Sequence, residues 1–205
     1  SLANLGVTER LLTSTASLNT TTGGGDILTA PSIFVRLQAA GSDANFARYD
    51  AATGIREHNV TTVGTLGASA GTNVADISAA DVAGAGNIDV QAIRTSANIA
   101  PTDGSTLLRI ARGGLIINGN TASTLSANTL FGTGTGASLT EAIVYVREGQ
   151  TGTSAISGNI TARDFTKTGP GLLEVSGATN LMNSNATRLP VLSVQDGTFR
   201  FANAG

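Results

Sequence analysis

Few residues of this chain have the type and spacing that chemistry would require. The segment Gly67–Gly71 reads Gly-Ala-Ser-Ala-Gly, which matches the pattern that presents a nucleophilic serine between a strand and a helix. Such a site also needs an acid and then a histidine later in the chain. The one histidine, His58, precedes Ser69, and the residues after Gly71 favour a strand. We therefore interpret Gly67–Gly71 as a turn.

Three carboxylates, Asp76, Asp81 and Asp89, form the densest acidic group in the sequence. A polysaccharide-cleaving enzyme built on a β-helix would need acids on successive coils of one face, with Arg or Lys nearby, as general acid and base. The spacing of these three residues places them within one or two coils. We interpret them as solvated loop acids that discourage edge-to-edge aggregation. A polysaccharide-processing enzyme is the third functional alternative.

Other stretches that resemble binding motifs lack the necessary partners. Gly132–Gly136 has no following Lys and no helix that could hold a phosphate. Gly23–Ile27 is a single copy of a calcium-binding pattern that functional sites repeat in tandem. Glu57 and His58 have no further metal ligands at a useful spacing. We expect no catalytic residue, no metal site and no cofactor.

The composition is typical of a secreted β-protein. Charged residues make up 13% of the chain, the net charge is −2 and the basic residues are scattered, so nucleic-acid binding has little electrostatic support. There is no Cys, which excludes disulfides and thiolate metal sites. No apolar run approaches the ~18–20 residues of a membrane-spanning helix. Aromatic residues are only 4%, which favours a narrow core of Val, Ile, Leu and Ala.

The elements that would position any site are short strands separated by Gly, Asn or Asp. At ~20–25 residues per coil, the chain would form roughly nine coils of a rod roughly 40 Å long. Asparagines at corners could stack as ladders or serve as left-handed turn residues, with Asn87, Asn118, Asn159 and Asn180 as candidates. The predicted strands are Ile33–Leu37, Val60–Val63, Val74–Ile77, Ile88–Ile93, Leu107–Ile110, Leu115–Ile117, Ile143–Val146, Ile156–Ile160, Leu172–Val175, Leu192–Val194 and a run that holds Phe199 and Phe201.

Two regions are expected along the chain. Residues 1–22 are rich in Thr and Ser and would form an extended N-terminal segment or a first strand. Residues 23–205 would form a single β-solenoid domain. Because the chain starts without an initiator Met, we interpret it as a processed product or an excised segment of a longer protein.

The clearest strand–corner–strand pattern lies between residues 165 and 201. Gly169, Pro170 and Gly171 form a sharp turn, because Gly tolerates a positive φ and Pro fixes φ near −65°. A short alternating run follows, and after a polar loop a second run ends at the turn pair Asp196-Gly197. Phe199 and Phe201 then begin a third run on one face. Such an order is typical of one coil of a parallel β-solenoid.

These residues resemble the autotransporter-associated β-strand repeat, or passenger-associated transport repeat, of very large secreted bacterial proteins. The resemblance covers about a sixth of the chain and implies an extracellular right-handed β-helix without a catalytic residue. The matching positions are Phe165, Lys167, Gly169, Gly171, Leu173, Val175, Gly177, Gly197, Thr198 and Phe199.

The predicted fold is therefore all-β, a right-handed parallel β-helix with irregular loops between short strands. The predicted function is non-catalytic and structural: part of an adhesin or stalk that is secreted or displayed on a bacterial cell surface, or a fibre subunit that stacks head to tail. The expected partners are further copies or a continuation of the chain. We expect no nucleic acid and no membrane span.

The main alternative is a passenger module that binds carbohydrate or a cell surface. Residues 38–58 show the weakest β pattern, and we predict a loop or small cap there. Aromatic rings stack on sugar rings, so the candidate binding residues are Phe46, Tyr49, Arg56 and His58.

Overall fold

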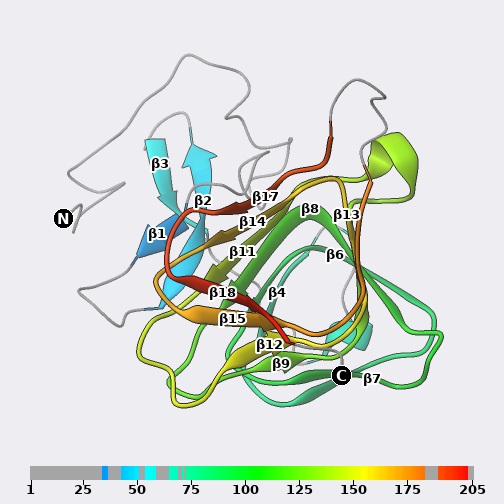
Figure 1. Ribbon diagram of the computed structural model, residues 1–205, viewed down its shortest axis with the longest axis horizontal. Helices are drawn as coiled ribbons and strands as arrows, with labels where there is room; N and C mark the ends of the chain where they lie inside the picture. Colours follow the sequence, from blue (N-terminus) through cyan, green and yellow to red (C-terminus); the bar gives the residue numbers. More distant parts are fainter. Residues whose placement is uncertain are drawn as a thin grey trace.

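The structure is a computed structural model that describes residues 34–36, 43–50, 54–58, 65–68, 71, 73–182 and 189–202. It is almost entirely β and forms a parallel β-solenoid of about six turns, seen in Figure 1 as nested coils. The predicted parallel β-helix is confirmed. The number of coils is smaller than the nine predicted, because the parallel coils described begin only near Val74.

Each coil contributes strands to three faces of the solenoid. The first face contains β4 (Val74–Ile77), the C-terminal halves of β6 (Asn87–Thr95) and β8 (Leu107–Ile117), β11 (Ala142–Val146), β14 (Phe165–Thr168) and β17 (Leu192–Val194). The second contains β5 (Asp81–Ala83), β7 (Ile99–Pro101), β9 (Thr124–Leu125), β12 (Ser154–Ile156), β15 (Leu172–Val175) and β18 (Thr198–Phe201). The third contains the N-terminal halves of β6 and β8, then β10 (Asn128–Phe131), β13 (Ile160–Ala162) and β16 (Thr179–Leu181).

Most predicted strands are present, and two are divided differently. Val74–Ile77 is confirmed as β4. Leu107–Ile110 and Leu115–Ile117 are one continuous strand, β8, which turns from the third face to the first. The predicted strand Ile156–Ile160 is wrong as one element, because a corner separates β12 from β13. The predicted strand Val60–Val63 lies outside the described residues.

The core is the narrow aliphatic interior that the composition predicts. Alternate residues of each strand point inward, and the parallel register places equivalent residues directly above one another. On the first face Ala75, Ile93, Leu115 and Val144 form one such column, and all are fully buried. Each fully buried Leu or Ile contributes about 1.5–3 kcal/mol.

Of the four candidate asparagines, Asn159 forms hydrogen bonds between coils, Asn118 binds the backbone of Ala44, and Asn87 and Asn180 lie in β6 and β16. No described residue other than Gly has a positive φ, so the left-handed turn role is wrong for the asparagines in the described part of the chain. Asn159 donates its N–H to Oδ1 of Asn128, and its own Oδ1 accepts the N–H of Ala178, both at 3.1 Å. Asn159 therefore belongs to a ladder, as one of the two alternatives predicted.

A small antiparallel sheet precedes the coils and lies outside them (Figure 1). It consists of β1 (Phe34–Arg36), β2 (Ala44–Asp50) and β3 (Gly54–Glu57). The loop or cap predicted for 38–58 is therefore wrong where the structure describes it. The sequence is poor in β-branched residues here, but burial of Ala44 and Phe46 on one face of β2 supplies the packing that a strand requires.

Candidate functional site

The three carboxylates singled out in the sequence do not form one site. Asp76 lies on the first face and Asp89 on the third, whereas Asp81 begins β5 on the second. Asp81 is buried and accepts the N–H of Leu66 at 2.6 Å. The structure therefore separates the acids that a polysaccharide-cleaving site would have to bring together.

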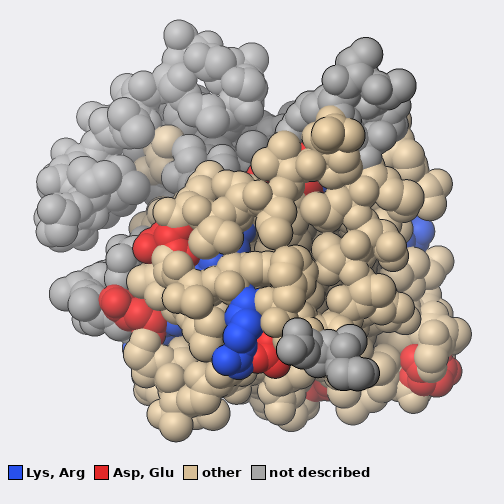
Figure 2. Space-filling model, in the orientation of Figure 1, with Lys and Arg blue, Asp and Glu red and all other residues tan. Residues whose placement is uncertain are grey.

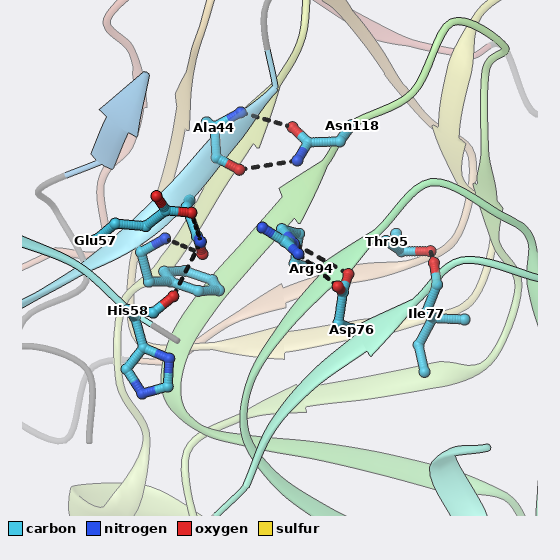
Figure 3. Close-up of polar contacts among 10 residues, drawn as sticks. Ala44, Glu57, His58, Asp76, Ile77, Arg94, Thr95 and Asn118 are labelled. Atoms are coloured by element: carbon cyan, nitrogen blue, oxygen red, sulfur yellow. Dashed lines mark hydrogen bonds and ion pairs between the residues drawn. The ribbon is translucent and has the colours of Figure 1, made fainter. Parts of the chain in front are cut away.

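Asp76 and Asp89 are each neutralised by an arginine of the next coil. Asp76 binds Arg94 through both carboxylate oxygens, with Nε and Oδ1 at 3.0 Å (Figure 3). Asp89 binds Arg109 in the same two-point manner, at 2.5 Å for both bonds. Such pairs hold the planar guanidinium in a fixed orientation. Figure 2 shows charged side chains in small groups on a largely uncharged face.

Leu66, directly before the serine motif, packs on the first coil. Leu66–Ala68 forms one 3-10 turn, η2, and Leu66 is fully buried against the core. The strand β4 begins at Val74, and Ser69, at the centre of the predicted turn, lies outside the described residues.

Apolar and polar side chains gather at the junction where β1 and β2 meet the first face. The apolar part of this junction brings Ala44 and Phe46 against Ala92, Ile116 and Tyr145. The ring of Phe34 lies 6.0 Å from that of Phe46 and 5.4 Å from that of Tyr145. The small sheet thus covers part of the outer surface of the solenoid.

Asn118, in the corner after β8, fixes the position of β2 at this junction. Its Nδ2 donates to the carbonyl of Ala44 at 2.8 Å, and its Oδ1 accepts the N–H of Ala44 at 3.0 Å (Figure 3). Asp43 adds an ion pair with Arg147 at 3.4 Å. Because Asn118 is buried, these two bonds satisfy polar groups that would otherwise be costly to bury.

Arg94 and the end of β3 complete the junction. Burial by itself lowers the pKa of Arg94, but the hydrogen bond to Asp76 and the fields of Asp76, Glu57 and Asp43 together raise the pKa above its ordinary value. Arg94 therefore stays charged. Asn45 donates to Glu57 at 2.5 Å and to the carbonyl of His58 at 3.0 Å, so the polar groups of β2 and β3 bind one another.

The predicted binding residues lie in β2, in β3 and directly after β3. Phe46 and His58 are buried, with 1% and 3% of their surface exposed, so neither ring is presented for stacking on a sugar. Tyr49 pairs with Ile55, and Arg56 pairs with Arg48, in the backbone register of β2 and β3. A binding role for Tyr49 and Arg56 stays a prediction.

The sequence analysis did not identify Arg94 or Arg109, and it singled out Asn118 only as a corner asparagine. The signal was present only in the coil register, which places Asp76 beside Arg94 and Asp89 beside Arg109. Among the described residues, no three His, Cys, Asp or Glu side chains gather as metal ligands. No helix in the described part of the chain is long and apolar enough to cross a membrane.

Comparison of the chain with protein-family models, with curated proteins and with solved structures finds no match. The parallel solenoid of about six turns is shown by the structure itself.

Proposed function

We propose that the chain is a non-catalytic structural β-solenoid, a length of stiff rod within a secreted or surface-displayed bacterial protein such as an adhesin stalk or a fibre. The observation that carries this proposal is the difference between the two ends of the stack. A solenoid needs a cover on each terminal coil, because an uncovered coil exposes apolar side chains and unpaired strand edges.

The first coil is covered and the last described coil is open. Leu66 is fully buried over the beginning of the stack, and Ala75, Ile77 and Ala83 of the first coil are all buried. At the other end, Leu192, Val194 and Phe201 are 42%, 48% and 56% exposed. They belong to β17 and β18, which are the terminal strands of their sheets among the described residues (Figure 1).

An exposed apolar group of this kind favours contact with a further coil. The ion pairs agree with a structural role. Asp76 and Asp89, the acids that a catalytic site would need, are each bound by an arginine. The residues that resemble the autotransporter-associated repeat support placement of the protein outside the cell.

Electron microscopy of the native source material tests the proposal, with gold-labelled antibodies raised against this chain. We expect label on rods or filaments at the cell surface or in the medium, and no label on cells that lack the gene. Label confined to the cell interior would contradict the proposal. Release of reducing ends from a polysaccharide, lost in Asp76→Asn or Asp89→Asn, would also contradict it and would support an enzyme.

A further inference from the structure

Lys167 is the only lysine in the chain, and it lies inside the solenoid. The sequence contains a single Lys among its 205 residues. In the register of the first face, Lys167 lies between Val144 of the preceding coil and Val194 of the following one, in a column otherwise made of apolar side chains. Its side chain has no exposed surface. An ammonium group in such a place needs specific partners to offset the loss of water.

The partners of Lys167 are main-chain carbonyls from two successive coils. The Nζ atom donates to the carbonyl of Gly169 in its own coil, and to the carbonyl of Asp196 in the next coil at 2.9 Å. Asp196 lies in the corner that joins β17 to β18. A single side chain therefore connects the two coils at this corner.

Gly197 leaves the space that the ammonium group occupies, and the carbonyl of Gly169 accepts a hydrogen bond from it. A Cβ atom at Gly197 would lie 2.5 Å from Nζ of Lys167 and 2.5 Å from the carbonyl oxygens of Gly169 and Gly171. Gly197 has a φ of 71° and Gly169 a φ of 76°, which residues with a Cβ rarely adopt. Lys167, Gly169 and Gly197 thus form one three-dimensional unit, although Gly197 lies in the next coil.

We propose that Lys167 holds the last described coil in register on the coil before it, by binding the carbonyl of Asp196 at the corner between β17 and β18. In this role Lys167 is a positioning residue. The repeat-like spacing of Lys, Gly-x-Gly and Asp-Gly then specifies how one coil attaches to the next. The inference does not depend on the proposed function, because two coils need a defined register in any solenoid.

Hydrogen exchange of the full chain tests the proposal, with Lys167→Met as the variant. Methionine has nearly the same length but cannot donate. The variant leaves the buried carbonyls of Gly169 and Asp196 without this donor, so we expect exchange in residues 192–201 to become at least about tenfold faster. Exchange in residues 74–95 should not change. Thr168→Val, on the same strand but at an outward-facing position, is the matched control and should leave both segments unchanged.

Rescue of the amine donor separates positioning from simple filling of the core. The chain has no Cys, so Lys167→Cys can be alkylated at one position with 2-bromoethylamine to restore an ammonium group of similar length. We expect the alkylated protein to recover the slow exchange of residues 192–201, whereas the unalkylated variant does not. Exchange that stays slow in Lys167→Met, or fast after alkylation, would overturn the proposal.

Acetylation of the unmodified chain provides a test that does not depend on the folding of a Lys167 variant. Acetic acid N-hydroxysuccinimide ester should modify Lys167 much more slowly in the folded chain than in urea. Gly197→Ala places a Cβ against Nζ and the carbonyl oxygens, so it should accelerate acetylation of Lys167 at least about tenfold. Equal rates in the variant and the unmodified chain would overturn the proposal.

Discussion

In the described part of the chain, three pairs of oppositely charged residues join neighbouring coils. Asp76 binds Arg94, Asp89 binds Arg109, and Glu174 binds Arg200, in each case across adjacent parallel strands. Each pair neutralises two charges and fixes the register of two coils at one point. The charged residues of these three pairs therefore help to connect the coils.

The first prediction compares two of these pairs that differ in burial. The Arg94 and Asp76 side chains are 18% and 19% exposed, and those of Arg109 and Asp89 are 27% and 45% exposed. Arg94→Leu leaves a poorly hydrated carboxylate and should lower the free energy of unfolding by about 1–3 kcal/mol. Arg109→Leu should lower it by less than about 1 kcal/mol. Urea unfolding measures both, and an equal loss would contradict the prediction.

The second prediction concerns pH and Lys167. Burial lowers the pKa of Lys167 to about 8, and the field of Asp196 partly opposes this effect. In the opened coil the pKa returns toward 10.5, so the opened form binds more protons between these two values. The free energy of opening should therefore rise with pH, by up to about 1.4 kcal/mol per unit from about pH 8 to 10.5.

Hydrogen exchange in residues 192–201, corrected for the intrinsic effect of pH, measures this dependence. Lys167→Met should lack it, while contributions from other titrating groups remain in both proteins. A flat difference between the two proteins over this pH range would show that Lys167 does not titrate on opening.

The candidate binding residues show that residue type alone does not predict which side chains are exposed. Aromatic and basic residues gather at 46–58, and their types are suitable for a glycan. Burial of Phe46 and His58 depends instead on contacts with strands far along the chain, such as those of Ala92 and Tyr145. A single sequence does not specify these contacts.

At the scale of elements, the strands were predictable where alternation was strong. Val74–Ile77 and Leu172–Val175 alternate inward and outward residues between Gly, Asn or Ser corners, and both are strands with the predicted limits. Ile156–Ile160 was also predicted as one strand, because its two ends are both isoleucine. The corner between them forms when Ser157 and Gly158 donate to the carbonyl of Leu125 in the preceding coil, which local alternation does not encode.

The third prediction tests the inward columns. Leu115 is fully buried in the first face, whereas Val82 on β5 points outward with 60% of its surface exposed. Leu115→Asp places a carboxylate in the apolar core, so it should cost at least about 3 kcal/mol or prevent folding. Val82→Asp should change the stability by less than about 0.5 kcal/mol. Thermal unfolding followed by circular dichroism measures both, and unchanged melting of Leu115→Asp would contradict the assigned packing.

The fourth prediction concerns attachment of the small sheet to the solenoid. Asn118→Ala removes both side-chain bonds to Ala44 and leaves two backbone groups without their partner, which should cost about 1–3 kcal/mol. Hydrogen exchange should accelerate in β2 but not in β13. Asn159→Ala, in an exposed corner, should instead affect the neighbourhood of Ala178. Acceleration throughout the chain in Asn118→Ala would show that the small sheet and the coils open together.

For the molecule as a whole, the open end of the stack leads to the fifth prediction. Leu192, Val194 and Phe201 should promote concentration-dependent association of the isolated chain. Phe201→Lys should shift the association to higher concentration without lowering the melting temperature of the monomer, because more than half of the Phe201 surface is exposed. Val82→Lys, on the side of the rod, is the control. Analytical ultracentrifugation distinguishes these outcomes, and identical association of the two variants would place the contact elsewhere.

The overall architecture was predictable, but its extent was not. Short strands and regular corner residues specify a parallel solenoid. The coil count failed because β2 and β3 pair antiparallel and lie beside the stack. Strand propensity is the same for both arrangements, and only the tertiary contacts distinguish them.

The three acid–arginine pairs between coils share an orientation. In each pair the carboxylate belongs to the coil nearer the N-terminus and the guanidinium to the coil nearer the C-terminus. Each pair is therefore an electric dipole, and the three have components along the axis of the stack that add. Two such rods that lie side by side attract each other when antiparallel and repel when parallel. Salt weakens this contribution beyond about 8–10 Å, so it acts between neighbouring rods mainly at low ionic strength.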